Sequence, residues 1–372
     1  MYKVGILSMQ RIFNYGSFLQ AMGLKSIIEE LGGEVQFVDY HPGECLIPSK
    51  SSGGLKRKVE KVVETFKYKA PLSSKLKFIK YKKNYASNYY PYLGITGEMN
   101  YSPKADLLVI GSDEVFNCVQ NNTNVGFTPE LFGADNNADR LVSYAGSFGN
   151  TTLDKIKQYN ISEKLKEWFD DFDSISVRDK NSVKIIKTLT GKDPYYHIDP
   201  VLAYDFMNKC NEIPKTVLEK EKYMILYGYS GRFTVDECEF IKRYAKEKRL
   251  KIICIGGVQN CCDEFVDCSP YEVLAYFKNA EEVITDTFHG SIMSIITHRK
   301  FVTLVRNSGY GNAEKLTDLL GRLHLDNRIV KNVRGTSGIM NDDIDYPSVD
   351  KVISMERENS YNYLKKQLEL CK

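Results

Sequence analysis

The stretch Val283–Val305, VITDTFHGSIMSIITHRKFVTLV, constrains the fold of this chain more than any other. A short apolar run leads into a polar turn over residues 286–290, and the apolar helix SIMSIITH and a β-rich run, FVTLV, follow. This order predicts a strand–turn–helix–strand unit. Two strands joined by a helix run parallel, and a parallel sheet is covered by helices on both faces. The stretch therefore predicts an α/β fold.

The polar turn of this unit is the first candidate site. Ligands bind at the carboxyl ends of parallel strands, where the next helix offers unpaired N–H groups and the positive end of its dipole. Gly290 lets a ligand approach the backbone, and Ser291 brings a hydroxyl. His289 stands beside them and is suited to proton transfer near neutral pH. The alternative is that His289 only packs or caps the turn, but the coincidence of strand end, glycine and helix start favours function.

The same alternation of strands and helices fills the chain twice. Strands are expected at residues 3–8, 34–40, 106–110 and 141–145, and then at KYMILYGY, LKIICIGG, EEVITD and KFVTLV. A chain of 372 residues exceeds one ordinary domain. We expect two doubly wound, Rossmann-like domains, residues 1–200 and 201–340, with residues 341–372 forming a linker and a helix that crosses back to the first domain. This arrangement resembles the glycosyltransferase-B architecture, whose cleft lies between the domains.

Two loops of the first half add candidates for binding an acceptor. The loop after the first strand contains Asn14, Tyr15 and Gly16, although Gly16 can equally serve a tight turn. This loop lacks the GxGxxG pattern of a dinucleotide site. A second polar run follows the third strand and supplies Gly111, Ser112, Asp113, Glu114 and Asn117. Asp113 can orient or deprotonate a sugar hydroxyl, or it can cap the next helix.

Arg178 is a cation at the end of the predicted strand over residues 174–177. A guanidinium at a strand end can clamp a carboxylate or a phosphate with two parallel hydrogen bonds. The structural alternative is an ion pair with Asp173 or Asp179.

The positive charge of the chain is concentrated in residues 50–83, which hold twelve Lys and Arg against Glu60 and Glu64. We expect residues 48–92 to form two short helices inserted in the first domain. A solvated basic face is one interpretation, and attraction to an anionic membrane surface or a phosphorylated lipid carrier is another. No nucleic-acid-binding module accompanies the basic run, so no nucleic-acid partner is expected.

The chain carries neither an export pattern nor a zinc pattern. It opens directly as a strand, and no stretch reaches the roughly 18–20 apolar residues of a membrane span. Nine irregularly spaced Cys argue against a disulfide framework. The cluster Cys254, Cys261, Cys262 and Cys268 lacks C-x-x-C spacing, so no metal is expected. We expect a cytoplasmic protein, at most peripheral at the inner face of the membrane.

With these pieces assembled, the sequence resembles the polysaccharide pyruvyl transferase family. The matching segments are NYGSFLQAMGLKSIIEELG, VQFVDY, LLVIGSDEVFN, SYAGSFG, ISVRD, HIDPVL, ITDTFHGS, LTDLLGRLHLDNRIV and RENSYNYL. They run in family order over nearly the whole chain. The resemblance implies an enzyme that moves the enolpyruvyl unit of phosphoenolpyruvate onto a sugar or a lipid-linked oligosaccharide, forming a pyruvate ketal in exopolysaccharide, capsule or cell-wall glycan. No metal or organic cofactor is implied.

The resemblance also implies roles for individual residues. His289 corresponds to the catalytic His, and Arg178 to the cation that holds phosphoenolpyruvate. This fits the chemistry, because C3 of the enol must be protonated and the donor's anionic groups need cations and N–H donors. Asp113 and Asp286 are the candidates to accept a proton from the sugar hydroxyl.

One position departs from the family pattern. Well-studied members carry Arg two residues before the catalytic His, where this sequence has Thr287, followed by Phe288 on the same donor side. One anion-binding charge is therefore missing. Lys315 and Arg306 are the candidates to replace it.

Two other functions remain open. A nucleotide-sugar glycosyltransferase of the same architecture needs a ribose-binding carboxylate late in the second domain, for which Glu314 and Asp318 are candidates. A non-catalytic sugar- or anion-binding subunit would explain Thr287, but not the presence of both His289 and Arg178.

Overall fold

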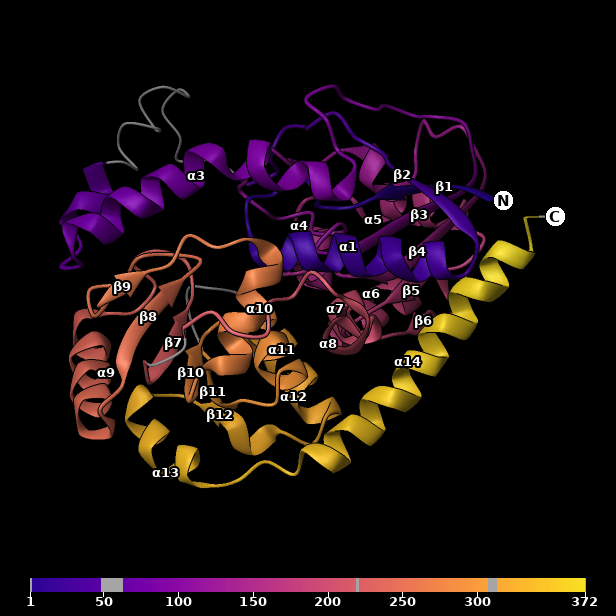
Figure 1. Ribbon diagram of the computed structural model, residues 1–372. Helices are drawn as coiled ribbons and strands as arrows, with labels where there is room; N and C mark the ends of the chain where they lie inside the picture. Colours follow the sequence, from indigo (N-terminus) through magenta and orange to yellow (C-terminus); the bar gives the residue numbers. More distant parts are fainter. Residues whose placement is uncertain (1, 48–62, 219–220, 307–312, 372) are drawn as a thin grey trace.

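The computed structural model describes residues 2–47, 63–218, 221–306 and 313–371. These residues form two six-stranded sheets, each covered by helices, in two domains (Figure 1). All strand pairs within both sheets are parallel. The expected two-domain α/β fold is confirmed.

The N-terminal sheet has the order β2-β1-β3-β4-β5-β6. Its strands are β1 (Tyr2–Leu7), β2 (Gly33–Phe37), β3 (Ala105–Asp113), β4 (Ala138–Gly146), β5 (Ser176–Val177) and β6 (Tyr195–Tyr196). Its helices are α1 (Tyr15–Glu30), α4 (Leu153–Gln158), α5 (Ser162–Asp170), α6 (Lys180–Thr190) and α7 (Pro200–Ala203), with the 3-10 turn η1 (Pro129–Phe132). The strand order reverses between β1 and β3, so a crevice opens at their carboxyl ends.

The C-terminal sheet has the order β12-β11-β10-β7-β8-β9. Its strands are β7 (Tyr223–Tyr227), β8 (Lys251–Ile255), β9 (Glu264–Phe265), β10 (Glu282–Thr285), β11 (Lys300–Leu304) and β12 (Ile329–Val330). The helices after the domain crossing are α8 (Phe206–Lys209), α9 (Val235–Lys248), α10 (Pro270–Asn279), α11 (Phe288–Ile296), α12 (Ala313–Arg322) and α13 (Thr336–Asn341), with 3-10 turns η2 (Asp326–Arg328) and η3 (Val333–Gly335). Here the order reverses between β7 and β10, which opens a second crevice.

The apolar core is continuous between the two domains. Buried side chains of α1, such as Leu24, belong to the same cluster as Ile284 and Ile292 of the C-terminal domain. Helix α1 packs against α7, α10 and α11. A second cluster, which includes Phe116 and Phe169, fills the other face of the N-terminal sheet. The apolar contact through α1 fixes the domains with their two crevices turned toward each other.

Two long helices join the domains away from this contact (Figure 1). Helix α3 (Leu72–Leu93) leaves the N-terminal domain and lies along β9, where the Ser74 hydroxyl accepts a hydrogen bond from the Phe265 N–H at 3.0 Å. Residues 63–67 are also helical, and residues 48–62 of the expected insert lie outside the described residues. Helix α3 is longer than the short helix expected and contacts the second domain.

Helix α14 (Tyr346–Glu369) starts at the C-terminal domain and returns to the first, as expected (Figure 1). The Tyr363 hydroxyl donates a hydrogen bond to the Ser143 carbonyl in β4 at 2.9 Å. Arg140, also in β4, donates to the Gln367 carbonyl at 3.1 Å.

Candidate active site

A cavity of about 310 Å³ lies where the two crevices face each other. Its polar wall holds three cations (Arg178, Arg232, Lys315), two carboxylates (Asp113, Glu114), four amides (Asn14, Gln120, Asn122, Asn150) and His289. Residues of both domains contribute, and we call this space the interdomain cavity.

The start of α11 places His289 in the cavity wall. Strand β10 ends at Thr285, and the Thr287 side chain accepts a hydrogen bond from the Gly290 N–H at 3.0 Å, which makes Thr287 the N-cap. The helix therefore begins at Phe288, inside the turn expected over residues 286–290. His289 is the second residue of the helix, and its position is fixed by regular backbone geometry.

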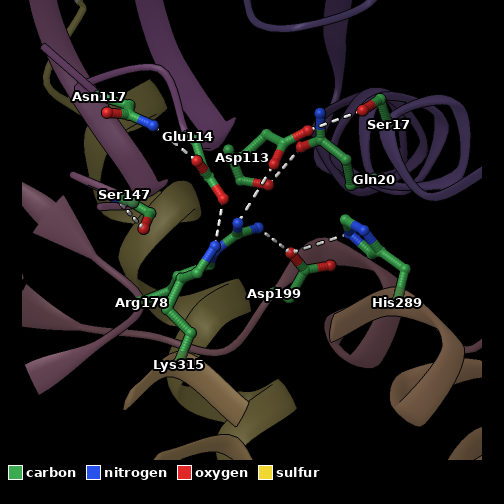
Figure 2. Close-up of polar contacts among 12 residues, drawn as sticks. Ser17, Gln20, Asp113, Glu114, Asn117, Ser147, Arg178, Asp199, His289 and Lys315 are labelled. Carbon is green, nitrogen blue, oxygen red and sulfur yellow. Dashed lines mark hydrogen bonds and ion pairs between the residues drawn. The ribbon is translucent and has the colours of Figure 1, made fainter. Parts of the chain in front are cut away.

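His289 reaches across the domain boundary to a buried carboxylate. Its Nε2 lies 3.6 Å from Oδ2 of Asp199 (Figure 2). Asp199 caps α7, because its Oδ1 accepts from the Val201 N–H at 2.9 Å. Burial acts to raise the pKa of Asp199, but His289 and Arg178 outweigh it and the pKa lies below its ordinary value. An ionised carboxylate of the N-terminal domain therefore faces the imidazole of the C-terminal domain.

Arg178 binds two carboxylates at the base of the cavity. Its NH1 donates to Oδ2 of Asp199 at 2.6 Å and its NH2 to Oδ1 of Asp113 at 3.2 Å (Figure 2). The guanidinium also lies over the Phe288 ring, 4.5 Å from the centroid, and the side chain is 2% exposed. The sequence alternative, a pair with Asp173 or Asp179, is not what the structure shows.

Asp113 is held from two sides. The Ser17 hydroxyl donates to its Oδ2 at 2.8 Å, while Arg178 holds Oδ1. Burial acts to raise the pKa of Asp113, but the charges of Arg178 and His289 and the hydrogen bond from Ser17 outweigh it, so the pKa lies below its ordinary value. Asp113 therefore faces the cavity as an ionised carboxylate.

Lys315 crosses from α12 to the N-terminal domain, where its ammonium binds Glu114 (Figure 2). The side-chain amide of Asn117 donates a hydrogen bond to the other carboxylate oxygen of Glu114 at 2.8 Å. Burial acts to raise the pKa of Glu114, but Lys315 lowers it below the ordinary value. The charge of Lys315, one candidate to replace the missing arginine, is matched by this carboxylate.

The family model "Polysaccharide pyruvyl transferase" matches residues 14–308, most of the chain and both walls of the cavity. The chain belongs to the polysaccharide pyruvyl transferase family. It is therefore a transferase of polysaccharide biosynthesis. A comparison with curated proteins finds no match.

Solved structures similar to this pyruvyl transferase share its fold at low sequence identity. Staphylococcus aureus MnaA with UDP has 10% identity and a TM-score of 0.51, over 98% of this chain and 94% of that one. Methanocaldococcus jannaschii UDP-GlcNAc 2-epimerase has 11% identity and a TM-score of 0.48, over 93% of each chain. Arabidopsis thaliana UGT89C1 with UDP has 10% identity and a TM-score of 0.45, over 100% and 99%. The likeness concerns the fold alone, which is glycosyltransferase-B-like.

Two residues predicted to bind the donor, Gly290 and Ser291, have structural roles in helix α11 instead. The Ser291 hydroxyl donates to the Thr287 carbonyl at 3.0 Å and contacts the Thr303 hydroxyl at 2.8 Å, and Ser291 is fully buried. A Cβ on Gly290 would lie 2.2 Å from Thr285 Oγ1, so this glycine serves close packing of helix on strand. Neither residue lines the cavity, whereas Thr287 and Phe288 do.

The acceptor-side candidates also divide into two groups. Asn14, Tyr15 and Glu114 line the cavity, while Gly16, Gly111, Ser112 and Asn117 do not. Strand β3 continues to Asp113, beyond its expected end, so Gly111 and Ser112 lie inside the sheet. The Ser112 hydroxyl is buried and donates a hydrogen bond to Oε1 of Gln20.

Asp286, the second candidate base, lies behind the cavity wall. It is 1% exposed, and its Oδ2 accepts from Arg232 Nε at 2.7 Å and from Arg306 Nε at 3.3 Å. Burial raises its pKa above the ordinary value, although both arginines act against the rise. Arg232 lines the cavity, but Asp286 and Arg306 do not.

Sequence reasoning missed several residues of the site. Asp199 was visible only as an Asp before a Pro, a pattern that predicts a helix cap and conceals its second role. Ser17 and Arg232 come from a helix start and a loop without a distinctive motif. The amides Gln120, Asn122 and Asn150 come from irregular segments, where no periodicity marks a side chain as facing a cavity.

No three His, Cys, Asp or Glu side chains of the described residues come together in a way that could hold a metal ion. The four clustered cysteines are buried. Across the described part of the chain, every helix is too short or too polar to traverse a bilayer.

Proposed function

We propose that this pyruvyl transferase takes phosphoenolpyruvate as donor and two hydroxyls of one sugar as acceptor, forming a pyruvate ketal and releasing phosphate. The sugar belongs to a polysaccharide precursor, such as a lipid-linked oligosaccharide. One observation carries the proposal: His289 of one domain lies 3.6 Å from Asp199 of the other, at a cavity lined by Asp113 and three cations.

The first step adds a sugar hydroxyl to the enol. The imidazolium of His289 gives its proton to C3 of phosphoenolpyruvate, and C2 becomes an oxocarbenium-like centre. A sugar oxygen then bonds to C2 and its proton passes to Asp113. The low pKa of Asp113 is no obstacle, because a hydroxyl becomes strongly acidic as it attacks such a centre. Asp199 stabilises the imidazolium before the transfer.

The second step closes the ketal. The bond between C2 and the phosphate oxygen breaks, and the neighbouring hydroxyl of the same sugar attacks C2. Its proton leaves with the phosphate, and the proton held by Asp113 passes to His289, which restores both residues. In the net reaction C3 gains one proton, and the two hydroxyl protons go to the phosphate and to His289. We propose that the three cations of the cavity, Arg178, Arg232 and Lys315, together offset the negative charge of the donor. His289 and Asp113 transfer the protons of the first step, the phosphate takes the proton of the second, and the cations offset the charge. We therefore propose that the reaction needs no metal or organic cofactor.

The glycosyltransferase alternative has less support from the site. Asp318 accepts hydrogen bonds from the Lys180 N–H at 2.9 Å and the Tyr196 hydroxyl at 2.8 Å. Neither Asp318 nor Glu314 lines the interdomain cavity. Neither Glu314 nor Asp318 is therefore placed to bind the ribose of a nucleotide sugar in this cavity.

The test is phosphate release from phosphoenolpyruvate in the presence of sugar acceptors, with the ketal detected as a mass increase on the glycan. We expect release by the wild type and a loss of about 10²–10⁴-fold in His289→Gln, the range for a removed general acid. UDP-sugars serve as the control donors. Turnover of UDP-sugars without phosphoenolpyruvate would instead support the glycosyltransferase. Binding of sugar without turnover of either donor would support the non-catalytic subunit.

We further propose a peripheral contact between the start of α3 and an anionic membrane surface. Four apolar side chains are exposed there and in the preceding helical residues 63–67: Val63 (53%), Phe66 (44%), Leu72 (61%) and Leu76 (53%). The exposed Lys67, Lys80 and Lys83 stand among them. A surface that is both apolar and basic suits a bilayer interface with anionic lipids. Lys56, Arg57 and Lys58 of the basic run lie outside the described residues.

Vesicle sedimentation tests this contact. We expect binding to vesicles containing phosphatidylserine and weaker binding after Lys67, Lys80 and Lys83 are changed to Glu together. Vesicles of phosphatidylcholine alone provide the control. Equal sedimentation of the wild type and the triple variant would reject the contact.

A further inference from the structure

Arg232 lies on the part of the cavity wall that the C-terminal domain provides. It follows β7, whose carboxyl end neighbours that of β10 at the reversal of strand order. His289 follows β10, so the two side chains come from the two adjacent strand ends that form this crevice. The side chain of Arg232 is 15% exposed, compared with 2% for Arg178.

The guanidinium of Arg232 is fixed from behind by Asp286. The hydrogen bond from Nε to Oδ2 measures 2.7 Å, and the carboxylate is 1% exposed. Gly228 leaves room for the other oxygen, because a Cβ on this residue would lie 3.2 Å from Oδ1 of Asp286. A guanidinium whose Nε is held in this way has its plane set before a ligand arrives, which favours bidentate recognition of a carboxylate or phosphate.

Arg306 contacts the same carboxylate but is used differently. Its NH1 and NH2 donate to the two oxygens of Glu237 at 2.7 and 3.0 Å. Its NH2 also donates to the Arg232 carbonyl at 3.2 Å. Arg306 is therefore occupied in fastening the loop that carries Arg232, and it does not line the cavity.

The other cations of the cavity are more deeply buried than Arg232, because only 2% of the Arg178 side chain and 6% of the Lys315 side chain are exposed. Thr287 caps α11 and brings no charge, and Lys315 is paired with Glu114 across the domain boundary. Arg178 holds two carboxylates.

We infer that Arg232 is the donor-binding cation of the C-terminal domain and takes the place of the charge absent at Thr287, with Asp286 as its positioning residue. The inference rests on the proposed function, and the ligand group is the carboxylate or phosphate of phosphoenolpyruvate. Asp286 then acts through Arg232 and does not receive the acceptor's proton.

Steady-state kinetics with both substrates varied test the inference. Arg232→Gln should raise KM for phosphoenolpyruvate about tenfold or more, the effect of one charged hydrogen-bonding partner, and leave KM for the acceptor within about twofold. Arg232→Lys keeps the charge but loses the planar fork, so an intermediate KM is expected. Arg357→Gln is the matched control, because this arginine also donates from Nε (2.8 Å to the Leu202 carbonyl) and pairs with a carboxylate, Asp205, outside the cavity.

Asp286→Asn separates positioning from proton transfer. A positioning role predicts a higher KM for phosphoenolpyruvate with an unchanged pH profile of kcat. A fall in kcat with an altered pH profile and an unchanged KM would make Asp286 the base and overturn that part of the inference. KM for phosphoenolpyruvate within twofold of wild type in Arg232→Gln would overturn the rest. If Arg232→Gln does not fold, Arg232→Lys decides by the same criterion.

Failure of the proposed function gives a different result. The wild type would then neither bind nor consume phosphoenolpyruvate, and calorimetry with inorganic phosphate becomes the probe. If the wild type binds phosphate and Arg232→Gln does not, Arg232 is an anion-binding residue even though phosphoenolpyruvate is not the donor. Binding that is equal in both proteins, or absent from the wild type, rejects the anion site as well.

Discussion

The imidazole of His289 rests directly on Gly16. A Cβ built on Gly16 would lie 2.1 Å from Nδ1 and 2.3 Å from Cγ of the ring. Gly16 belongs to the first turn of α1 in the N-terminal domain, so one domain leaves room for the proposed acid of the other. A glycine considered as a ligand-binding residue thus has a different role, which is to set the position of His289 relative to Asp199.

Gly16→Ala should therefore disable the reaction more than the fold. The added methyl displaces the ring from Asp199, and we expect kcat to fall by about 10²–10⁴, as for a misplaced general acid. Thermal denaturation of the variant reports the accompanying loss of stability. Gly338→Ala in α13 is the control, because nothing lies within 4 Å of a Cβ there. Wild-type kcat in Gly16→Ala would contradict the assigned role of His289.

Arg178→Ala should destabilise the protein strongly. The substitution leaves Asp113 and Asp199 ionised without their shared cation, and loss of one partner from a buried ion pair costs about 3–5 kcal/mol. Urea unfolding measures the change in the free energy of unfolding. Adding Asp199→Asn should recover part of the loss, and strict additivity of the two changes would refute the coupling. Because of this cost, Arg178→Ala is a poor reporter of donor binding compared with Arg232→Gln.

Acid should destabilise the protein through His197 before the carboxylates respond. Burial, followed by the charge of Arg322, lowers the pKa of His197 to about 4. The neutral ring's contribution is complete above the unfolded pKa of about 6.5 and is lost as pH falls toward 4, up to about 3 kcal/mol in all. Unfolding free energies measured between pH 7 and 4 should show this slope, and His197→Gln should flatten it. A slope that persists in the variant would assign it to other groups.

The contacts of α1 and α3 with the second domain should depend on two tyrosines, one from each helix, that share one acceptor. The hydroxyls of Tyr15 and Tyr89 each donate to the Cys268 carbonyl at 2.8 Å. Tyr15→Phe and Tyr89→Phe should each cost about 0.5–1.5 kcal/mol, and the double variant more than the sum, because it leaves the buried carbonyl without either donor. Chemical denaturation of the four proteins measures the cycle. Tyr195→Phe, with an exposed side chain, is the control.

The sequence predicted most of the fold because its signals are local. The apolar runs at 3–8, 106–110 and 283–285 are strands, since each is apolar enough to be buried on both faces of a parallel sheet. Carboxyl strand ends converge in such a sheet, so the pattern of strands and turns alone is enough to predict that Asp113 and His289 lie at the crevices of their sheets, and both line the interdomain cavity.

The remaining features of the site depend on contacts that sequence order does not reveal. Ser291 and Ser112 look like available donors in the sequence, but each is used by a neighbour that becomes visible only once the helix start and the strand length are known. Arg232 and Asp286 lie far apart in the chain and meet because β7 and β10 are adjacent, a consequence of topology. Asp199 joins His289 only through the packing of one domain on the other.

The position of Asp199 and His289 on opposite sides of the domain boundary has a kinetic consequence. Their 3.6 Å approach depends on the packing of α1 in one domain against α10 and α11 in the other. In the proposed reaction, a change that weakens this packing therefore lowers kcat even when it lies outside the cavity.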